Sequence, residues 1–145
     1  MNIRGFTKAD YDYIVSVLDS WWAGPGGERP HPVFFYELGR DALIADEGSE
    51  VVGFLLGFVA PGEPKTGYVH LVGIHPEHRR GGVGKALYGE FVERCRNQGA
   101  TRLKAITNVG NEGSVRFHEA LGFTVREDPS YAGRDRARLV FTKDL

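Results

Sequence analysis

The chain has 145 residues and a net charge of −1, from 18 Lys and Arg and 19 Asp and Glu. This length is typical of a single domain with one hydrophobic core, so we expect one domain over residues 1–145. The balanced charge gives no general attraction to nucleic acid or to an anionic membrane, and no segment approaches the roughly 20 apolar residues of a membrane span. The residues after Met1 predict a strand rather than a signal peptide, which indicates a cytoplasmic protein.

The single cysteine, Cys95, excludes an internal disulfide. It falls on the apolar face of a predicted helix, so we expect it in the core and not as a nucleophile. The Cys and His residues lack the spacing of zinc ligands, so the sequence predicts no metal site.

In the first half of the chain, residues 2–6 predict a strand. Thr7, with Asp10 three positions later, predicts the capped start of a helix that runs to about residue 22. Residues 23–31 are rich in Gly and Pro and predict a loop, and Pro32 suits the first turn of a second helix to residue 38. Residues 41–47 and 51–60 predict a hairpin, and a turn at 61–64 leads to a strand at 68–75.

In the second half, Val83, Leu87, Phe91 and Cys95 recur at four-residue intervals and predict a helix, which Gly99 closes as a left-handed cap. Residues 102–107 predict a strand, 111–121 a helix, and 123–127 and 137–143 the last two strands. Strands that alternate with helices predict an α/β fold (α+β mixed sheet), with helices on both faces of the sheet.

A basic, glycine-rich turn joins the strand at 68–75 to the next helix, and it is the most informative segment. We call it the cradle; it consists of Arg79, Arg80, Gly81, Gly82, Val83, Gly84 and Lys85. Its glycines let the backbone come close to a ligand, and the new helix supplies unpaired N–H groups and the positive end of its dipole. Three basic side chains add to that field. The cradle therefore predicts an anion site that suits a pyrophosphate.

The spacing of the glycines fits neither a dinucleotide-binding turn nor a Walker loop. It fits Arg-x-x-Gly-x-Gly, at Arg79, Gly82 and Gly84, after a strand that ends in Ile-His-Pro. Residues 111–123 fit a second pattern, Asn-x-x-Ala/Ser-x-x-Phe-Tyr-x-x-x-Gly-Phe, except that His118 replaces the tyrosine. In these two motifs the chain resembles the GNAT superfamily of acetyl-CoA-dependent N-acetyltransferases. The order of elements is similar over nearly the whole chain, most weakly between residues 20 and 40.

The resemblance implies direct transfer of an acetyl group from acetyl-CoA to an amine, with a mostly antiparallel central sheet. It implies that the cradle binds the pyrophosphate, that the backbone N–H of Val72 stabilises the oxyanion, and that Ile74 pairs with the pantetheine arm. Asn111 and Ser114 become further cofactor contacts, although Asn111 fits a helix N-cap equally well. Gly73 either permits a bulge beside Val72 or gives room to a neighbouring side chain.

Amide formation requires a base, because an alkylamine is protonated at neutral pH. We expect His70 to be that base, since it lies two residues before Val72 and shares its strand face by period-two alternation. A histidine bonded in the core, or facing the opposite side of the sheet, remains the alternative. Tyr68 is a weaker candidate for the base and a stronger one for the wall of the acceptor pocket.

His118 stands where many members of the resembled family have a tyrosine that protonates the leaving thiolate. By helical spacing Asn111, Ser114 and His118 share one polar stripe, so His118 is predicted to point where that tyrosine points. We therefore expect His118 to act as the acid, directly or through a water molecule.

Trp21, Trp22 and His31 are the predicted acceptor wall, together with Tyr68, although at least half of the aromatic residues in this region are expected in the core. The acceptor is a small-molecule or peptide amine that the sequence does not select. Two alternatives stay open: an acyl-CoA-binding sensor or regulatory domain without catalysis, and a longer-chain or O-acyl transferase. The resemblance also allows a homodimer, paired through the last strand or through residues 51–60.

Overall fold

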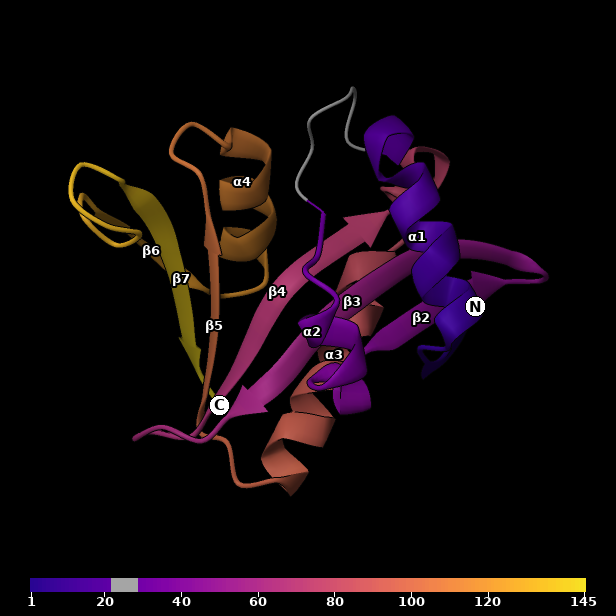
Figure 1. Ribbon diagram of the computed structural model, residues 1–145, viewed down its shortest axis with the longest axis horizontal. Coiled ribbons are helices and arrows are strands. Elements are labelled where there is room, and N and C mark those ends of the chain that lie inside the picture. The colour runs from indigo at the N-terminus through magenta and orange to yellow at the C-terminus, as the bar shows by residue number, and fades with distance from the viewer. Residues whose placement is uncertain (22–28) are drawn as a thin grey trace. The chain divides into compact units, whose positions relative to one another are not determined.

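The structure is a computed structural model that describes residues 1–21 and 29–145. Within these ranges the elements are β1 (Asn2–Gly5), α1 (Lys8–Trp21), α2 (Val33–Tyr36), η1 (Gly39–Asp41), β2 (Leu43–Glu47), β3 (Glu50–Ala60), β4 (Thr66–Ile74), η2 (Pro76–His78), α3 (Val83–Asn97), β5 (Arg102–Thr107), α4 (Glu112–Ala120), β6 (Thr124–Asp128) and β7 (Arg138–Asp144) (Figure 1). The predicted helices and strands are confirmed in type and order, with ends shifted by a residue or two. The two short 3-10 turns, η1 and η2, were not predicted.

The strands of the described residues form one seven-stranded sheet in the order β1-β2-β3-β4-β5-β7-β6. β4 and β5 run parallel, whereas β1 and β2, β2 and β3, β5 and β7, and β6 and β7 are antiparallel. The predicted mixed and mostly antiparallel sheet is therefore confirmed. In the part of the chain that the structure describes, every helix is too short or too polar to cross a membrane.

The chain divides into two compact units that share three elements. Unit 1 consists of Met1–Phe58 and His70–Arg94, and unit 2 of Val59–Val69 and Cys95–Leu145. β3, β4 and α3 therefore each contribute residues to both units. The cradle and the second half of β4 belong to unit 1, whereas α4 and the first half of β4 belong to unit 2.

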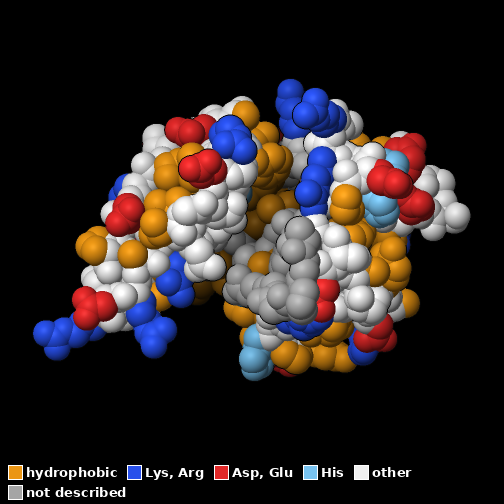
Figure 2. Space-filling view, turned by 90° about the horizontal axis from the view of Figure 1, so that it is seen from above, with side chains coloured by type: hydrophobic (Ala, Val, Ile, Leu, Met, Phe, Trp, Pro, Cys, Tyr) orange, Lys and Arg blue, Asp and Glu red, His pale blue; other side chains and the backbone are white. Residues whose placement is uncertain are grey.

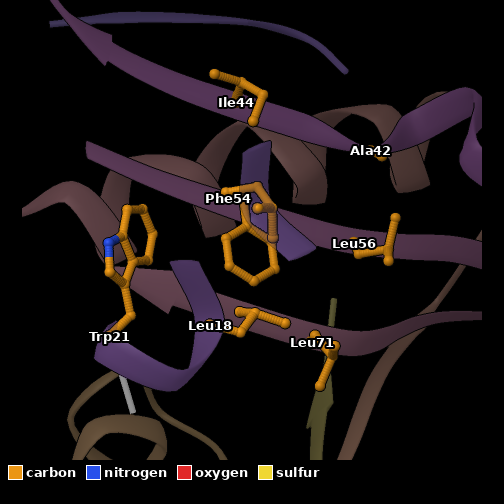
Figure 3. Close-up of a cluster of buried hydrophobic side chains, with 8 residues drawn as sticks. Leu18, Trp21, Ala42, Ile44, Phe54, Leu56 and Leu71 are labelled. Carbon is orange, nitrogen blue, oxygen red and sulfur yellow. The ribbon is translucent and has the colours of Figure 1, made fainter. Parts of the chain in front are cut away.

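In unit 1, helices cover both faces of the strands. On one face, Leu18 and Trp21 of α1 are buried against Phe54 of β3, in a cluster drawn in Figure 3. The other members of this cluster are Ile14, Ala42, Ile44, Leu56 and Leu71. On the opposite face lies α3, because a Cβ placed on Gly53 would meet Val83 and Leu87. Burial of this apolar surface is the main force that holds α1 and α3 to the strands.

The start of α1 is fixed by the predicted capping box. The backbone N–H of Thr7 donates to Asp10 Oδ2 at 2.8 Å, and the N–H of Asp10 donates to Thr7 Oγ1 at 3.2 Å. Arg4 of β1 bridges Asp10 at 2.7 Å and Asp46 of β2 at 2.5 Å. This ion pair network ties the helix to the first two strands.

In unit 2, β4 pairs with β5 over residues 66–69, and α4 packs on the strands through His118, which stacks on Phe141 of β7. Cys95 is fully buried, as predicted, and a Cβ on Gly67 would lie 2.4 Å from its Sγ atom. Gly99 has a φ of +86°, which confirms the predicted left-handed cap after α3.

Candidate functional site

The cradle has the backbone of an anion site. Gly82 has a φ of +79°, and a Cβ placed there would meet no atom within 4 Å, so the backbone is open to a ligand on that side. Ala86 is the first residue to donate into α3, to the carbonyl of Gly82 at 3.0 Å. The four preceding N–H groups, from Gly82 to Lys85, have no partner within the helix and form its positive end. These groups fit a pyrophosphate.

The basic side chains of the cradle differ from one another. Arg79, Arg80 and Lys85 are all exposed. Arg79 also donates to the backbone carbonyl of Trp21, and through Nε to the carbonyl of Ile74 at 3.3 Å. On the face that Figure 2 shows, basic side chains are interspersed with acidic ones, in agreement with a net charge near zero.

His70 lies beside α2. Its ring stacks on Phe34 of α2 at 3.8 Å, and Phe34 packs against the α1 cluster, to which Leu71 also belongs. Burial alternates along this part of β4, with Val69, Leu71 and Gly73 buried and His70 and Val72 half-buried. The predicted shared face of His70 and Val72 stays a prediction.

Gly73 was expected either to permit a bulge or to give room to a neighbour, and the structure supports the second alternative. A Cβ on Gly73 would lie 2.4 Å from Cε1 of Phe54. The ring of Phe54 thus occupies the space that any larger residue would need. Gly73 therefore serves the packing of the α1 cluster.

His70 lies among aromatic rings of unit 1. Phe34 covers one face of the imidazole and lies 6.0 Å from the ring of Phe58. This stacking fixes the plane of the imidazole and surrounds it with apolar atoms. The contact between Phe34 and His70 could not be predicted from the sequence, because α2 and β4 are far apart in the chain.

The predicted acceptor wall is corrected in part. The side chain of Trp21 is only 3% exposed and lies 6.1 Å from the ring of Phe54, so it is a core residue and cannot line an open pocket. Trp22 lies outside the described residues. His31 is exposed and its Nδ1 accepts the N–H of Val33 at 3.1 Å, at the start of α2. Tyr68, in unit 2, is half-buried, and its place in the acceptor wall stays a prediction.

In unit 2, Asn111 is the N-cap of α4. Its Oδ1 accepts the N–H of Ser114 at 3.2 Å and its Nδ2 donates to Thr107 Oγ1 at 3.0 Å. The N-cap alternative is therefore confirmed. The cofactor contacts of Asn111 and Ser114 stay predictions. The side-chain amide of Asn111 has two N–H groups, and only one of them takes part in these two bonds.

His118 shares a side of α4 with Ser114, as predicted, since Ser114 Oγ lies 3.3 Å from Nδ1 of His118, but His118 is only 4% exposed and faces protein atoms instead of solvent. Its ring stacks on Phe141 at 4.2 Å and meets Phe123 edge-on at 5.1 Å, so aromatic packing holds it against β7. Nδ1 lies 2.8 Å from the carbonyl of Ser114, and a carbonyl only accepts, so Nδ1 carries the proton of the neutral ring. Burial lowers the pKa of His118, which favours that neutral form.

A cluster that the sequence did not predict lies just before the cradle. Glu50, His75 and His78 each offer a possible ligand atom, all within 4.8 Å of one another. Oε1 of Glu50 is 3.0 Å from Nε2 of His78, and Nδ1 of His75 accepts the N–H of Glu77 at 3.1 Å. Neutral His75 therefore carries its proton on Nε2, which is not the form that binds a metal through that nitrogen. These bonds instead fix η2, the turn that leads into the cradle.

With this geometry described, the comparisons with known proteins decide the family. The sequence pattern of the Acetyltransferase (GNAT) family matches residues 11–123, a range that contains β4, the cradle and α4. The chain belongs to the GNAT family. It is an acetyl-CoA-dependent N-acetyltransferase, and the cradle has the backbone that the donor's pyrophosphate needs.

Relatives and solved structures agree with this assignment. An L-methionine sulfoximine/L-methionine sulfone acetyltransferase of Salmonella typhimurium is 28% identical over 142 residues, which cover 86% of this chain and 81% of that protein. The structure of yncA from Salmonella typhimurium with acetyl-CoA has a TM-score of 0.73 at 22% identity, over 99% of this chain and 93% of that one. Arabidopsis thaliana Naa50, in complex with the bisubstrate analogue CoA-Ac-MVNAL, has a TM-score of 0.75 at 17% identity, over 99% and 98%. The two structures show that the fold is shared.

Proposed function

We propose that this N-acetyltransferase acts on the primary amino group of a small amino acid. The supporting observation is the similarity to an acetyltransferase whose acceptors are methionine derivatives, over most of both chains. Peptide amines are the second candidate, because the Naa50 structure contains a bisubstrate analogue with a peptide portion. The proposal concerns the acceptor only, since the donor follows from the family.

In the proposed mechanism His70 is the general base. The lone pair of the amine nitrogen attacks the acetyl carbonyl, the C–S bond breaks, and the proton of the nitrogen passes to the imidazole of His70. Phe34 supports this role because its stacking holds the imidazole plane in one orientation. The N–H of Val72 would donate to the oxyanion, and Ile74 would pair with the pantetheine arm.

The leaving thiolate needs a proton, and His118 is not well prepared to supply it. Its single proton is on Nδ1, bonded to the carbonyl of Ser114, and its lowered pKa disfavours a second proton. A thiolate with a pKa near that of cysteine, about 8.5, is already a fair leaving group at neutral pH. We therefore propose that solvent protonates the thiolate, with His118 as a second candidate.

Release of coenzyme A from acetyl-CoA tests the acceptor class. The panel contains methionine sulfone, other free amino acids, a short peptide, a polyamine and an alcohol. We expect turnover with free amino acids, and no turnover in Gly84→Val, which places a branched side chain in the first turn of α3. Turnover with the peptide alone would contradict the proposed acceptor, and binding of acetyl-CoA without turnover of any amine would indicate the sensor instead.

Location and assembly complete the proposal. We propose a cytoplasmic protein, because acetyl-CoA and free amino acids are abundant there, and cell fractionation tests this. We also propose a homodimer, but not through the predicted strands: β3 lies between β2 and β4, and β7 lies between β5 and β6, so neither is an edge of the sheet. Sedimentation at micromolar concentration tests the homodimer, and a monomer throughout that range would contradict it.

A further inference from the structure

Arg79 is the first residue of the cradle motif, yet its side chain is bonded to the protein backbone. The guanidinium donates to the carbonyl of Trp21, the last residue of α1, and to that of Ile74, the last residue of β4. These bonds use two of the five N–H donors of the guanidinium and orient it toward the two carbonyls, which leaves only the other donors for a phosphate. The side chain of Arg79 is therefore directed at α1 and β4.

The end of α1 needs such a partner. The last four carbonyls of a helix have no acceptor role within it and form the negative end of its dipole. The last turn of α1 contains no basic residue and carries Asp19, whose charge has the unfavourable sign for that end and is paired with Arg29 at 2.8 Å. Arg79 supplies a positive charge directly to the carbonyl of Trp21 from another part of the chain.

The helices of unit 2 show the same arrangement. Lys65 donates to the carbonyl of Gln98 at 3.0 Å, just after α3, and Lys143 donates to the carbonyl of Leu121 at 2.7 Å, just after α4. Among the described residues, each helix longer than one turn thus ends on a basic side chain that is distant in sequence. Arg79 follows this pattern, which is structural at the other two helices.

Further contacts join the end of α1 to the entrance of the cradle. The ring of Trp21 meets that of His75 edge-on at 5.5 Å, and His75 is the residue that caps η2. The backbone of Trp21 therefore contacts the first residue of the cradle, and its side chain contacts the segment between β4 and the cradle.

We propose that Arg79 is a positioning residue: it caps α1 and holds the cradle against the ends of α1 and β4, while Arg80 and Lys85 provide the charges that attract phosphate. The inference rests on the proposed binding of acetyl-CoA at the cradle. It gives Arg79 a role different from the direct cofactor contact that the motif implies.

Lysine substitutions separate charge from geometry. Lysine keeps the charge but lacks the planar fork that reaches two carbonyls. We expect Arg79→Lys and Arg79→Met to weaken coenzyme A binding alike, about three- to tenfold, as expected for a lost helix-end interaction. At the control position we expect Arg80→Lys to bind nearly as well as the wild type, and Arg80→Met to bind more weakly. Binding by Arg79→Lys within about twofold of the wild type, beside a weakened Arg79→Met, would overturn the proposal.

Hydrogen exchange gives a readout that does not depend on ligand. We expect the amides in the last turn of α1 to exchange about tenfold faster in both Arg79 variants and at the wild-type rate in Arg80→Met. Lys143→Met is the matched control, with faster exchange confined to the end of α4. Unchanged amide exchange at the end of α1 in both Arg79 variants would contradict the proposed role of Arg79 as the cap of that helix. If the wild type fails to bind coenzyme A, the proposed cofactor site fails, and the exchange experiment still decides the role of Arg79.

Discussion

At the scale of single residues, the proposed base gives the sharpest test of mechanism. We expect His70→Ala to lower kcat about 10²- to 10⁴-fold, which is the usual contribution of a general base, and to leave the affinity for acetyl-CoA unchanged. Phe34→Leu removes only the stacked ring, so we expect a smaller loss with the base still present. Steady-state kinetics and a binding isotherm measure both. A His70→Ala enzyme with normal kcat would transfer the role to Tyr68 or to a bound water molecule.

His118 links pH to stability through its lowered pKa. The unfolded chain binds a proton near pH 6.5 while folded His118 does not, so the free energy of unfolding falls as the pH drops below about 6.5 and levels off below the folded pKa. We expect His118→Phe, which keeps an aromatic ring beside Phe141, to flatten this decline. Denaturant titrations between pH 7 and 4 measure it, with the exposed His31→Gln as the control.

The His118→Phe variant also tests which group protonates the leaving thiolate. If solvent supplies the proton, kcat of His118→Phe should stay within about tenfold of the wild type, below the usual 10²-fold contribution of a general acid. A larger loss of kcat in His118→Phe, with activity recovered in His118→Tyr, would indicate that His118 is the general acid, as the motif suggests.

At the scale of elements, β4 shows how far the sequence could predict the site. Its type, direction and boundaries follow from its apolar residues and the flanking turns. The stacking of His70 on Phe34 does not, because it depends on how α2 packs on the strand. Likewise, the i, i+3, i+7 spacing of α4 predicts which side chains share a stripe, but not which stripe faces β7. The local sequence pattern therefore predicts the type and extent of an element, whereas tertiary contacts decide which of its sides is buried.

The close packing of β4 on β3 predicts the effect of one methyl group. In Gly73→Ala the new Cβ would overlap the ring of Phe54, so we expect a loss of about 1 to 3 kcal/mol in the free energy of unfolding. Gly89→Ala is the control, because Gly89 is an exposed residue of α3 with no atom within 4 Å of its Cβ position, and alanine should stabilise a helix by up to about 1 kcal/mol there. Chemical denaturation measures both. Phe54→Leu should relieve part of the cost, and an additive double variant would contradict the overlap.

The first turn of α1 predicts a second pH dependence. Arg4 and the Thr7 N–H lower the pKa of Asp10 to about 2, so its contribution is present at pH values above about 3.8 and is lost as the pH falls toward 2. Since Arg4 is about one-third exposed, we expect Asp10→Asn to cost about 1 to 2 kcal/mol at pH 7, less than the shift alone implies. The difference from the wild type should vanish near pH 2, and a constant difference would contradict the ion pair. Asp12→Asn, in an exposed pair with Lys8, is the control.

At the scale of the whole molecule, chain continuity opposes independent unfolding of the two units. β3, β4 and α3 each enter both units, so these three elements are complete only when both units are folded. We therefore propose that residues 1–145 unfold as one domain. Calorimetry should give one transition whose calorimetric and van't Hoff enthalpies agree, and two resolved transitions would contradict the single domain.

Ligand binding should move that transition as a unit. A donor present at a hundredfold excess over its Kd adds about 2.7 kcal/mol to the free energy of unfolding, which for a domain of this size corresponds to about 5 to 10 °C in Tm. We expect this shift with acetyl-CoA and coenzyme A and not with ATP or NAD, because in the proposed site the cradle would bind the pyrophosphate and β4 would pair with the pantetheine arm. Gly84→Val, folded but with its first helical turn filled, should lose the shift. An equal rise in Tm with ATP would show that the cradle binds phosphates in general. No rise in Tm with acetyl-CoA would contradict the proposed cofactor site.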